Sequence, residues 1–136
     1  MISKKTNDWT VLIVDDEPDN LGVAQKVLSY GGANVHIARN GVEGLTVLQS
    51  LKPTFILLDL SMPEMDGWEM FERTRSDEKF SDVPIIALTA HAMAGDKERI
   101  EEAGFDGYIP KPFRINSFME DIQTTIALFN ERLNKA

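Results

Sequence analysis

Phe55-Ile-Leu-Leu-Asp59-Leu-Ser-Met-Pro-Glu-Met-Asp-Gly67 is the stretch that decides the fold. Its first four residues form an unbroken apolar run between two prolines, which is typical of a strand buried on both faces of a sheet. The carboxylate of Asp59 follows at once, and the prolines and glycine after it predict a turn. Because ligands bind at the carboxyl ends of strands in open parallel sheets, the stretch predicts a central strand that presents one acid at that edge.

Four other segments have the pattern of strands, and helical patterns alternate with them. The predicted strands, besides residues 55–58, are residues 10–14, 34–38, 84–89 and 107–109. The predicted helices are residues 18–30, 42–51, 67–76, 90–103 and 114–134. Residues 76–82 are expected to be a polar connection, and residues 1–9 a mobile polar lead-in to one domain of residues 10–134. Five strands that alternate with five helices predict an α/β fold, with a parallel sheet covered on both faces.

The composition excludes several classes of protein. The chain has 136 residues, which argues for one domain, and its formal net charge of −8 argues against direct nucleic-acid binding. It has no cysteine, so neither a disulfide framework nor a thiolate metal site is available. No apolar run approaches the roughly 20 residues that span a bilayer, and the start lacks the apolar region of a signal peptide. We therefore expect a cytoplasmic protein without a membrane partner.

Polar side chains stand at the ends of four of the predicted strands. Asp15 and Asp16 follow the first strand, Asp59 the third, Thr89 ends the fourth and Lys111 follows the fifth. In a parallel sheet all these ends lie at one edge, so the groups should converge. Three carboxylates favour a hard divalent cation such as Mg²⁺, and a lysine and a hydroxyl add what a phosphoryl group needs. A carboxylate can itself accept the phosphoryl group, and Asp59 is the best candidate because it comes from the middle strand.

Each of these residues also has an ordinary structural explanation when it is taken alone. Asp59 could start a turn, and the pair Asp15-Asp16 could cap a helix and be solvated. Thr89 alone is most simply a strand residue, and Lys111 alone a surface charge. The two histidines are expected at the surface and the methionines in packing roles. The coincidence of all the strand-end groups favours the site.

Four motifs, in this order and spacing, carry a resemblance to a known family. They are Val11-Leu-Ile-Val-Asp-Asp-Glu17, Leu57-Leu-Asp-Leu-Ser-Met-Pro-Glu-Met-Asp-Gly67, Ile86-Ala-Leu-Thr-Ala90 and Gly107-Tyr-Ile-Pro-Lys-Pro112. Together they resemble the receiver domain of two-component response regulators, over about residues 10–130. Residues 89–97 are similar to those of single-domain regulators of the cell-division type and of receivers in hybrid histidine kinases. No output domain follows the last predicted helix, so we expect a stand-alone receiver or one excised from a larger protein.

The resemblance implies a flavodoxin-like, doubly wound fold with strand order 2-1-3-4-5, and a phosphorylation site. Asp59 would accept the phosphoryl group from a phosphohistidine of a histidine kinase or phosphotransfer protein. Mg²⁺, or Mn²⁺ in its place, would be held by Asp16, Asp59 and the backbone carbonyl of Ser61, with Asp15 acting through water. Ser61 and His91 lie where side chains tune the lifetime of the phosphorylated state in such domains.

The resemblance also implies how the signal leaves the site. Lys111 would contact the phosphoryl group, and Thr89 would bond one of its oxygens and move toward it. Tyr108 would then turn inward and reshape the face formed by the fourth helix, the fifth strand and the fifth helix, where a downstream protein would bind. The Lys111–Pro112 peptide bond would be cis. Such a domain catalyses only its own phosphorylation and dephosphorylation, so we do not expect a conventional enzyme.

Three other functions fit an α/β chain of this size. A phosphatase with an Asp nucleophile resembles Asp-x-Asp after the first strand, whereas here the two acids are adjacent and the isolated Asp59 follows the third strand. A flavin carrier needs a hydroxyl-rich phosphate loop where this chain has Asp15-Asp16-Glu17. The third alternative is a docking module that is never phosphorylated. The complete set of acids argues against it, and a phosphoryl labelling assay distinguishes it from a receiver.

Overall fold

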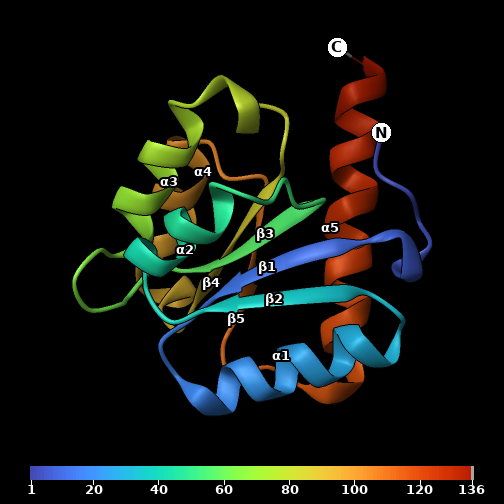
Figure 1. The fold of residues 1–136 in the computed structure, drawn as a ribbon, viewed down its shortest axis with the longest axis horizontal. Coiled ribbons are helices and arrows are strands. Elements are labelled where there is room, and N and C mark those ends of the chain that lie inside the picture. Colours follow the sequence, from blue (N-terminus) through green and yellow to red (C-terminus); the bar gives the residue numbers. More distant parts are fainter. Residues whose placement is uncertain (136) are drawn as a thin grey trace.

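The computed structural model describes residues 1–135 and forms a five-stranded parallel sheet between two layers of helices (Figure 1). The strand order β2-β1-β3-β4-β5 is the one predicted. The strands are β1 (Thr10–Val14), β2 (Asn34–Ala38), β3 (Phe55–Asp59), β4 (Ile85–Thr89) and β5 (Gly107–Pro110). The helices are α1 (Pro18–Tyr30), α2 (Gly41–Leu48), α3 (Gly67–Arg75), α4 (Asp96–Ala103) and α5 (Ile115–Lys135). Short 3-10 helices are η1 (Thr6–Asp8), η2 (Glu78–Phe80) and η3 (Ala92–Ala94).

The alternation of side chains along the strands divides the core in two. Val11 and Ile13 face α1 and α5, whereas Leu12 and Val14 face α2, α3 and α4. Figure 1 shows the same division, with α1 and α5 against one face of the sheet and the other three helices against the opposite face. Every residue of β3 is buried, because this strand has neighbours on both sides and helices on both faces. The apolar run of residues 55–58 is thus the centre of the sheet.

The chain from β4 to β5 differs from its prediction. A continuous helix over residues 90–103 was expected, but α4 begins only at Asp96, after η3 and the left-handed Gly95 (φ 103°). Ile100 is the buried residue of this eight-residue helix, and Ala103 at its end is exposed. The left-handed backbone of Gly95, which glycine adopts at no steric cost, is what ends the helical run before α4.

Two aromatic residues on the α3 side, Phe80 and Trp68, add to the core to different extents. The connection 76–82 contains η2, and its Phe80 is buried at 4% exposure. Trp68 of α3 is half-buried, and its ring meets Phe105 edge-on with centroids 5.6 Å apart. Both residues pack on the α3 side of the sheet.

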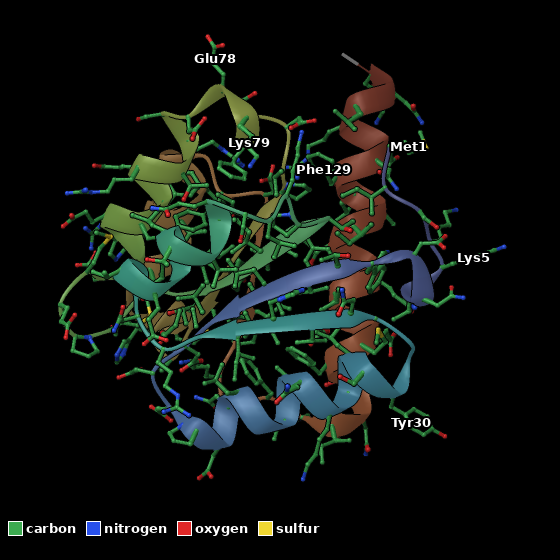
Figure 2. All side chains as sticks on the ribbon, in the orientation of Figure 1. Met1, Lys5, Tyr30, Glu78, Lys79 and Phe129 are labelled. Carbon is green, nitrogen blue, oxygen red and sulfur yellow. The ribbon has the colours of Figure 1, made fainter. Side chains whose placement is uncertain are left out.

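The N-terminal residues pack beside the end of α5 (Figure 2). Trp9, predicted to belong to the polar lead-in, is 1% exposed and lies in the core, with its ring 5.2 Å from that of Phe55. The Ile2 N–H donates to Asn130 Oδ1 at 2.8 Å, and Asn130 Nδ2 donates to the Ile2 carbonyl at 2.9 Å. The mobility expected for residues 1–9 stays a prediction, but Trp9 is part of the core.

Candidate functional site

The carboxyl ends of β1, β3, β4 and β5 meet at one edge of the sheet. The register places Val14 beside Leu58, Asp59 beside Leu88, and Thr89 beside Pro110. The next residue after β1, Asp15, continues the sheet for one more hydrogen bond, from its N–H to the Ala38 carbonyl at 3.1 Å. The strand-end groups are therefore neighbours although up to 96 positions separate them in sequence, from Asp15 to Lys111.

Three carboxylates converge at this edge. Asp15, Asp16 and Asp59 each offer one oxygen, and these three oxygens lie within 4.8 Å of one another. Asp15 is fully buried and Asp59 is 4% exposed, whereas Asp16 is exposed to solvent. Three like charges at this separation repel one another, so the cluster favours either a bound cation or a bound proton.

Lys111 supplies a positive charge between two of the acids. Its Nζ lies 2.9 Å from Asp15 Oδ2 and 3.1 Å from Asp59 Oδ1, and its side chain is 9% exposed. Burial by itself lowers the pKa of Lys111, but the hydrogen bond and charge of Asp15 and the charge of Asp59 outweigh it, so the pKa is raised. The ammonium is therefore a permanent cation. The Lys111–Pro112 bond is cis, as predicted.

Asp59 binds its proton unusually tightly for a carboxyl. Burial, and then the charge of Asp15, raise its pKa to about 7, although Lys111 and the Ser61 N–H partly oppose them. Near neutral pH a large share of Asp59 is thus protonated when no further cation is near. A divalent cation placed among the three acids would favour the ionised form.

The turn after β3 is shaped around the Asp59 carboxylate. The Ser61 N–H donates to Asp59 Oδ1 at 3.2 Å, and the Gly67 N–H donates to the Leu60 carbonyl at 3.2 Å. A side chain at Gly67 would collide with the backbone carbonyl oxygen of Asp59, so this close return of the chain requires glycine. Asp66 then caps α3 by accepting the Glu69 N–H at 2.9 Å. The loop that sequence analysis identified as a turn therefore fixes the acid it follows.

Thr89 ends β4 and is 2% exposed. Its hydroxyl donates to Asp96 Oδ2 at 2.7 Å and accepts the His91 N–H at 2.9 Å. Asp96 was not among the predicted site residues, because residues 90–103 were treated as one helix. The Gly95-Asp96 pair, in which a left-handed residue precedes an acid at a helix start, is the signal that could have located it.

A cavity of about 140 Å³ opens among the predicted site residues. Its lining is Glu17, Asp59, Leu60, Ser61, Leu88, Thr89, Ala90, His91 and Lys111. Tyr108 lies farther from the strand ends, beside Ala87 in the register. Its side chain is half-buried against the core on the α3 side. Asp59, Ser61, Thr89 and Lys111 thus share this cavity, whereas Asp15 and Asp16 adjoin Asp59 in the acidic cluster and Tyr108 is set back.

A larger hollow of about 780 Å³ lies elsewhere, between α1 and the start of α5. Its floor is mainly apolar, with Val23, Val27 and Met119 among its residues. Tyr30, at the end of α1, is 96% exposed beside it and points away from the domain (Figure 2). Asp59 and Lys111 line the smaller cavity, and neither lines this larger hollow.

The acidic cluster fits Mg²⁺. Carboxylate oxygens are the ligands this ion takes in proteins, and the three oxygens are close enough to share one ion. Asp15 Oδ2 is buried and pairs with Lys111 Nζ at 2.9 Å, and a carboxylate oxygen has further lone pairs to offer a cation. Asp15, Asp16 and Asp59 are therefore the residues that could hold the ion.

Comparison with known proteins gives one consistent family. The family model described as "Response regulator receiver domain" matches residues 11–123. The polar-differentiation response regulator DivK of Brucella anthropi is 35% identical over 115 residues, which are 85% of this chain and 94% of DivK.

Two solved structures extend this result. The receiver domain of sensor histidine kinase PA1611 from Pseudomonas aeruginosa, whose structure has a magnesium ion coordinated in the active site cleft, is 32% identical with a TM-score of 0.77. The match covers 88% of this chain and 98% of that one. The chemotaxis response regulator CheY4 of Vibrio cholerae is 28% identical with a TM-score of 0.80, and covers 85% of this chain and 97% of its own. Within residues 1–135, no helix has the length and apolarity that a bilayer crossing needs.

Proposed function

The chain belongs to the response regulator receiver family, and from this we propose that it is a phosphoacceptor switch whose acceptor is Asp59. Receiver domains are generally signalling domains of two-component systems rather than conventional enzymes. The observation that carries the proposal is the ammonium of Lys111, 3.1 Å from Asp59 Oδ1 and 2.9 Å from Asp15 Oδ2. Phosphoryl oxygens require positive charge and hydrogen-bond donors, and the buried ammonium of Lys111 supplies both beside the proposed acceptor.

The proposed reaction moves one phosphoryl group from nitrogen to oxygen. An ionised Asp59 oxygen attacks the phosphorus of a phosphohistidine on a kinase or phosphotransfer protein, and a P–O bond forms as the P–N bond breaks. The imidazole nitrogen keeps the electron pair and takes a proton, and Asp59 becomes an aspartyl phosphate. Lys111 stays protonated throughout and neutralises the added charge. Hydrolysis later returns the free carboxylate and inorganic phosphate.

Mg²⁺, when bound, would supply positive charge to the phosphoryl oxygens. In this proposal Asp16, Asp59 and the backbone carbonyl of Ser61 hold the ion, and Asp15 acts through water. The three close carboxylate oxygens support this assignment, as does the magnesium ion in the cleft of the PA1611 receiver domain. Mn²⁺ is the alternative ion, since it also takes oxygen ligands.

The output side of the proposal is a change of surface. Phosphorylation biases a two-state equilibrium in which Thr89 bonds a phosphoryl oxygen and Tyr108 turns inward. The face of α4, β5 and α5 then binds a downstream protein. The position of Tyr108 in β5, half-buried against the core, is compatible with this step. We propose the cytoplasm as the location, with which a cysteine-free chain is compatible.

Phosphorylation by acetyl phosphate, followed by separation of the phosphorylated form, tests the assignment. The wild-type protein should be labelled with Mg²⁺ and not after chelation, and Asp59→Asn should not be labelled. Asp66→Asn is the matched control, because Asp66 is an exposed acid of the same loop and asparagine still caps a helix. Equal labelling of Asp59→Asn would remove Asp59 as the acceptor. No labelling of the wild type, with this donor or a cognate kinase, would favour a docking module that is not phosphorylated.

A further inference from the structure

The hydroxyl proton of Thr89 is already donated in a hydrogen bond. A threonine hydroxyl has one proton to donate and two positions to accept. Here the proton goes to Asp96 Oδ2, with the two oxygens 2.7 Å apart, and the His91 N–H at 2.9 Å fills one accepting position. Thr89 therefore cannot donate to another oxygen unless it first gives up Asp96.

The same side chain borders the cavity that holds Asp59. Thr89, Asp59 and Lys111 all line it, and its volume of about 140 Å³ is small enough that a group added to Asp59 lies close to each of them. The Thr89 backbone is fixed, because its carbonyl accepts the Lys111 N–H at 2.8 Å and the residue is 2% exposed. An oxygen attached to Asp59 would therefore compete with Asp96 for the hydroxyl by a movement of the side chain.

We propose that Asp96 is a positioning residue, which holds Thr89 in the unphosphorylated arrangement until a phosphoryl oxygen displaces it. This proposal rests on the proposed phosphorylation of Asp59. Because Asp96 makes the resting arrangement more stable, it lowers the affinity of the cleft for a phosphoryl group. It also prevents Thr89 from taking its active position before the group arrives.

Asp96 connects this exchange to α4. It is the first residue of that helix and follows Gly95, whose left-handed backbone (φ 103°) separates the helix from η3. Its own N–H reaches the His91 carbonyl only at 3.4 Å, so the side-chain bond to Thr89 is the shorter of its two connections to the end of β4. Release of the Asp96 side chain would free the start of α4, which is one edge of the proposed docking face.

One aromatic contact offers a spectroscopic signature of this movement. The guanidinium of Arg99, on the next turn of α4, lies 4.0 Å from the centre of the Trp68 ring in α3. A shift of α4 would change the surroundings of the indole and so its fluorescence. The other tryptophan, Trp9, is buried against Phe55 on the opposite face of the sheet and should not respond.

The test uses beryllium fluoride with Mg²⁺ as the probe, since this anion mimics a phosphoryl group on a carboxylate. Asp96→Ala should bind it about tenfold more tightly than the wild type, the low end of what one hydrogen bond to a carboxylate contributes. Asp96→Asn keeps an acceptor oxygen without the charge and should fall between them. Glu98→Ala is the matched control, because Glu98 is an exposed acid of the same helical turn, and it should match the wild type.

Two further readouts separate positioning from a general effect on α4. The gain from Asp96→Ala should vanish in a Thr89→Ala background, where no hydroxyl remains to be held. Without probe, the Trp68 fluorescence of Asp96→Ala should already be shifted toward that of the probe-bound wild type.

The outcomes distinguish this proposal from the proposed function. A wild type that does not respond to the probe would overturn phosphorylation of Asp59 itself. A responsive wild type with unchanged or weaker binding in Asp96→Ala would overturn the role of Asp96 alone. The same conclusion follows if the gain persists in the Thr89→Ala background.

Discussion

The pKa of Asp59 predicts that Mg²⁺ binding strengthens with pH around neutrality. Since that pKa is about 7 in the metal-free protein, about one tenth of Asp59 is ionised at pH 6 and about nine tenths at pH 8. If the ion binds only the ionised form, its apparent affinity rises about tenfold over this interval, which is about 1.4 kcal/mol. Calorimetric titration with MgCl₂ at constant ionic strength measures this directly.

The variant Asp59→Asn provides the comparison. It removes the titrating group but keeps the size of the side chain, so its weaker Mg²⁺ binding should change little between pH 6 and pH 8. His91 lines the same cavity, so His91→Asn is measured in parallel and should keep the wild-type slope. A flat profile for the wild type, or an equal slope in Asp59→Asn, would refute the reasoning.

The same raised pKa of Asp59 makes the metal-free protein less stable as the pH rises toward 7. In the unfolded chain Asp59 titrates near pH 4, so between about pH 4 and pH 7 the folded state holds the proton more tightly than the unfolded one. The contribution of Asp59 to stability is therefore present at low pH and lost as the pH rises through 7. Asp59→Asn should be more stable than the wild type at pH 8, by about 2 kcal/mol after allowance for solvent screening, and the difference should shrink toward pH 4.

Three substitutions, with their comparison variants, test the packing of the fold by urea unfolding. Gly67→Ala should destabilise the protein by about 1–3 kcal/mol, because the new methyl meets the Asp59 carbonyl. Gly22→Ala has open space around it and should be neutral or stabilising. Equal effects of the two substitutions would contradict the close return of the loop at Gly67. Arg75→Ala should cost about 3 kcal/mol of stability, because Arg75 pairs with Asp106 at 2.7 Å and donates to two backbone carbonyls. Arg73→Ala breaks only an exposed ion pair and should cost under about 0.5 kcal/mol. Asn130→Ala should cost about 1–2 kcal/mol of stability, because it leaves the backbone of Ile2 without its hydrogen-bond partner. Removal of residues 1–5 should cost a similar amount. No loss of stability in either case would support a mobile lead-in.

Apolar runs and strand-end acids were sufficient to predict the sheet and the convergence at its edge. Residues 55–58 could hardly be anything but a central strand, and alternation of strands with helices leaves few topologies. Once the strands are parallel, Asp15, Asp59 and Lys111 must approach one another. The register and the short ion pairs of Lys111 agree with that expectation.

The interruption before α4 could not be predicted from periodicity. Residues 90–95 are rich in alanine, which favours a helix on propensity alone, so a continuous helix was the natural expectation. What separates η3 from α4 is the left-handed Gly95, and what holds the start of α4 is the Asp96–Thr89 bond. That bond joins a helix to the end of a strand, so it becomes visible only when both are placed in space.

Trp9 shows the same limit at the other end of the chain. Its neighbours in sequence are polar, so a window of residues 1–9 averages to a solvated segment. The ring is nevertheless buried between the first strand and the core, where it meets Phe55, and its Nε1 donates to the Ser3 carbonyl at 2.8 Å. A single aromatic residue before a strand carries no period from which its burial could be inferred.

Chemical trapping of the phosphorylated residue tests the central claim most directly. Borohydride reduces an aspartyl phosphate to homoserine, so the protein is treated with acetyl phosphate and Mg²⁺, reduced, digested and analysed by peptide mass spectrometry. The account predicts homoserine at position 59 and at no other aspartate, and none when Mg²⁺ is chelated. Homoserine at position 15 or 16, or a reduced protein that keeps aspartate at position 59, would contradict it.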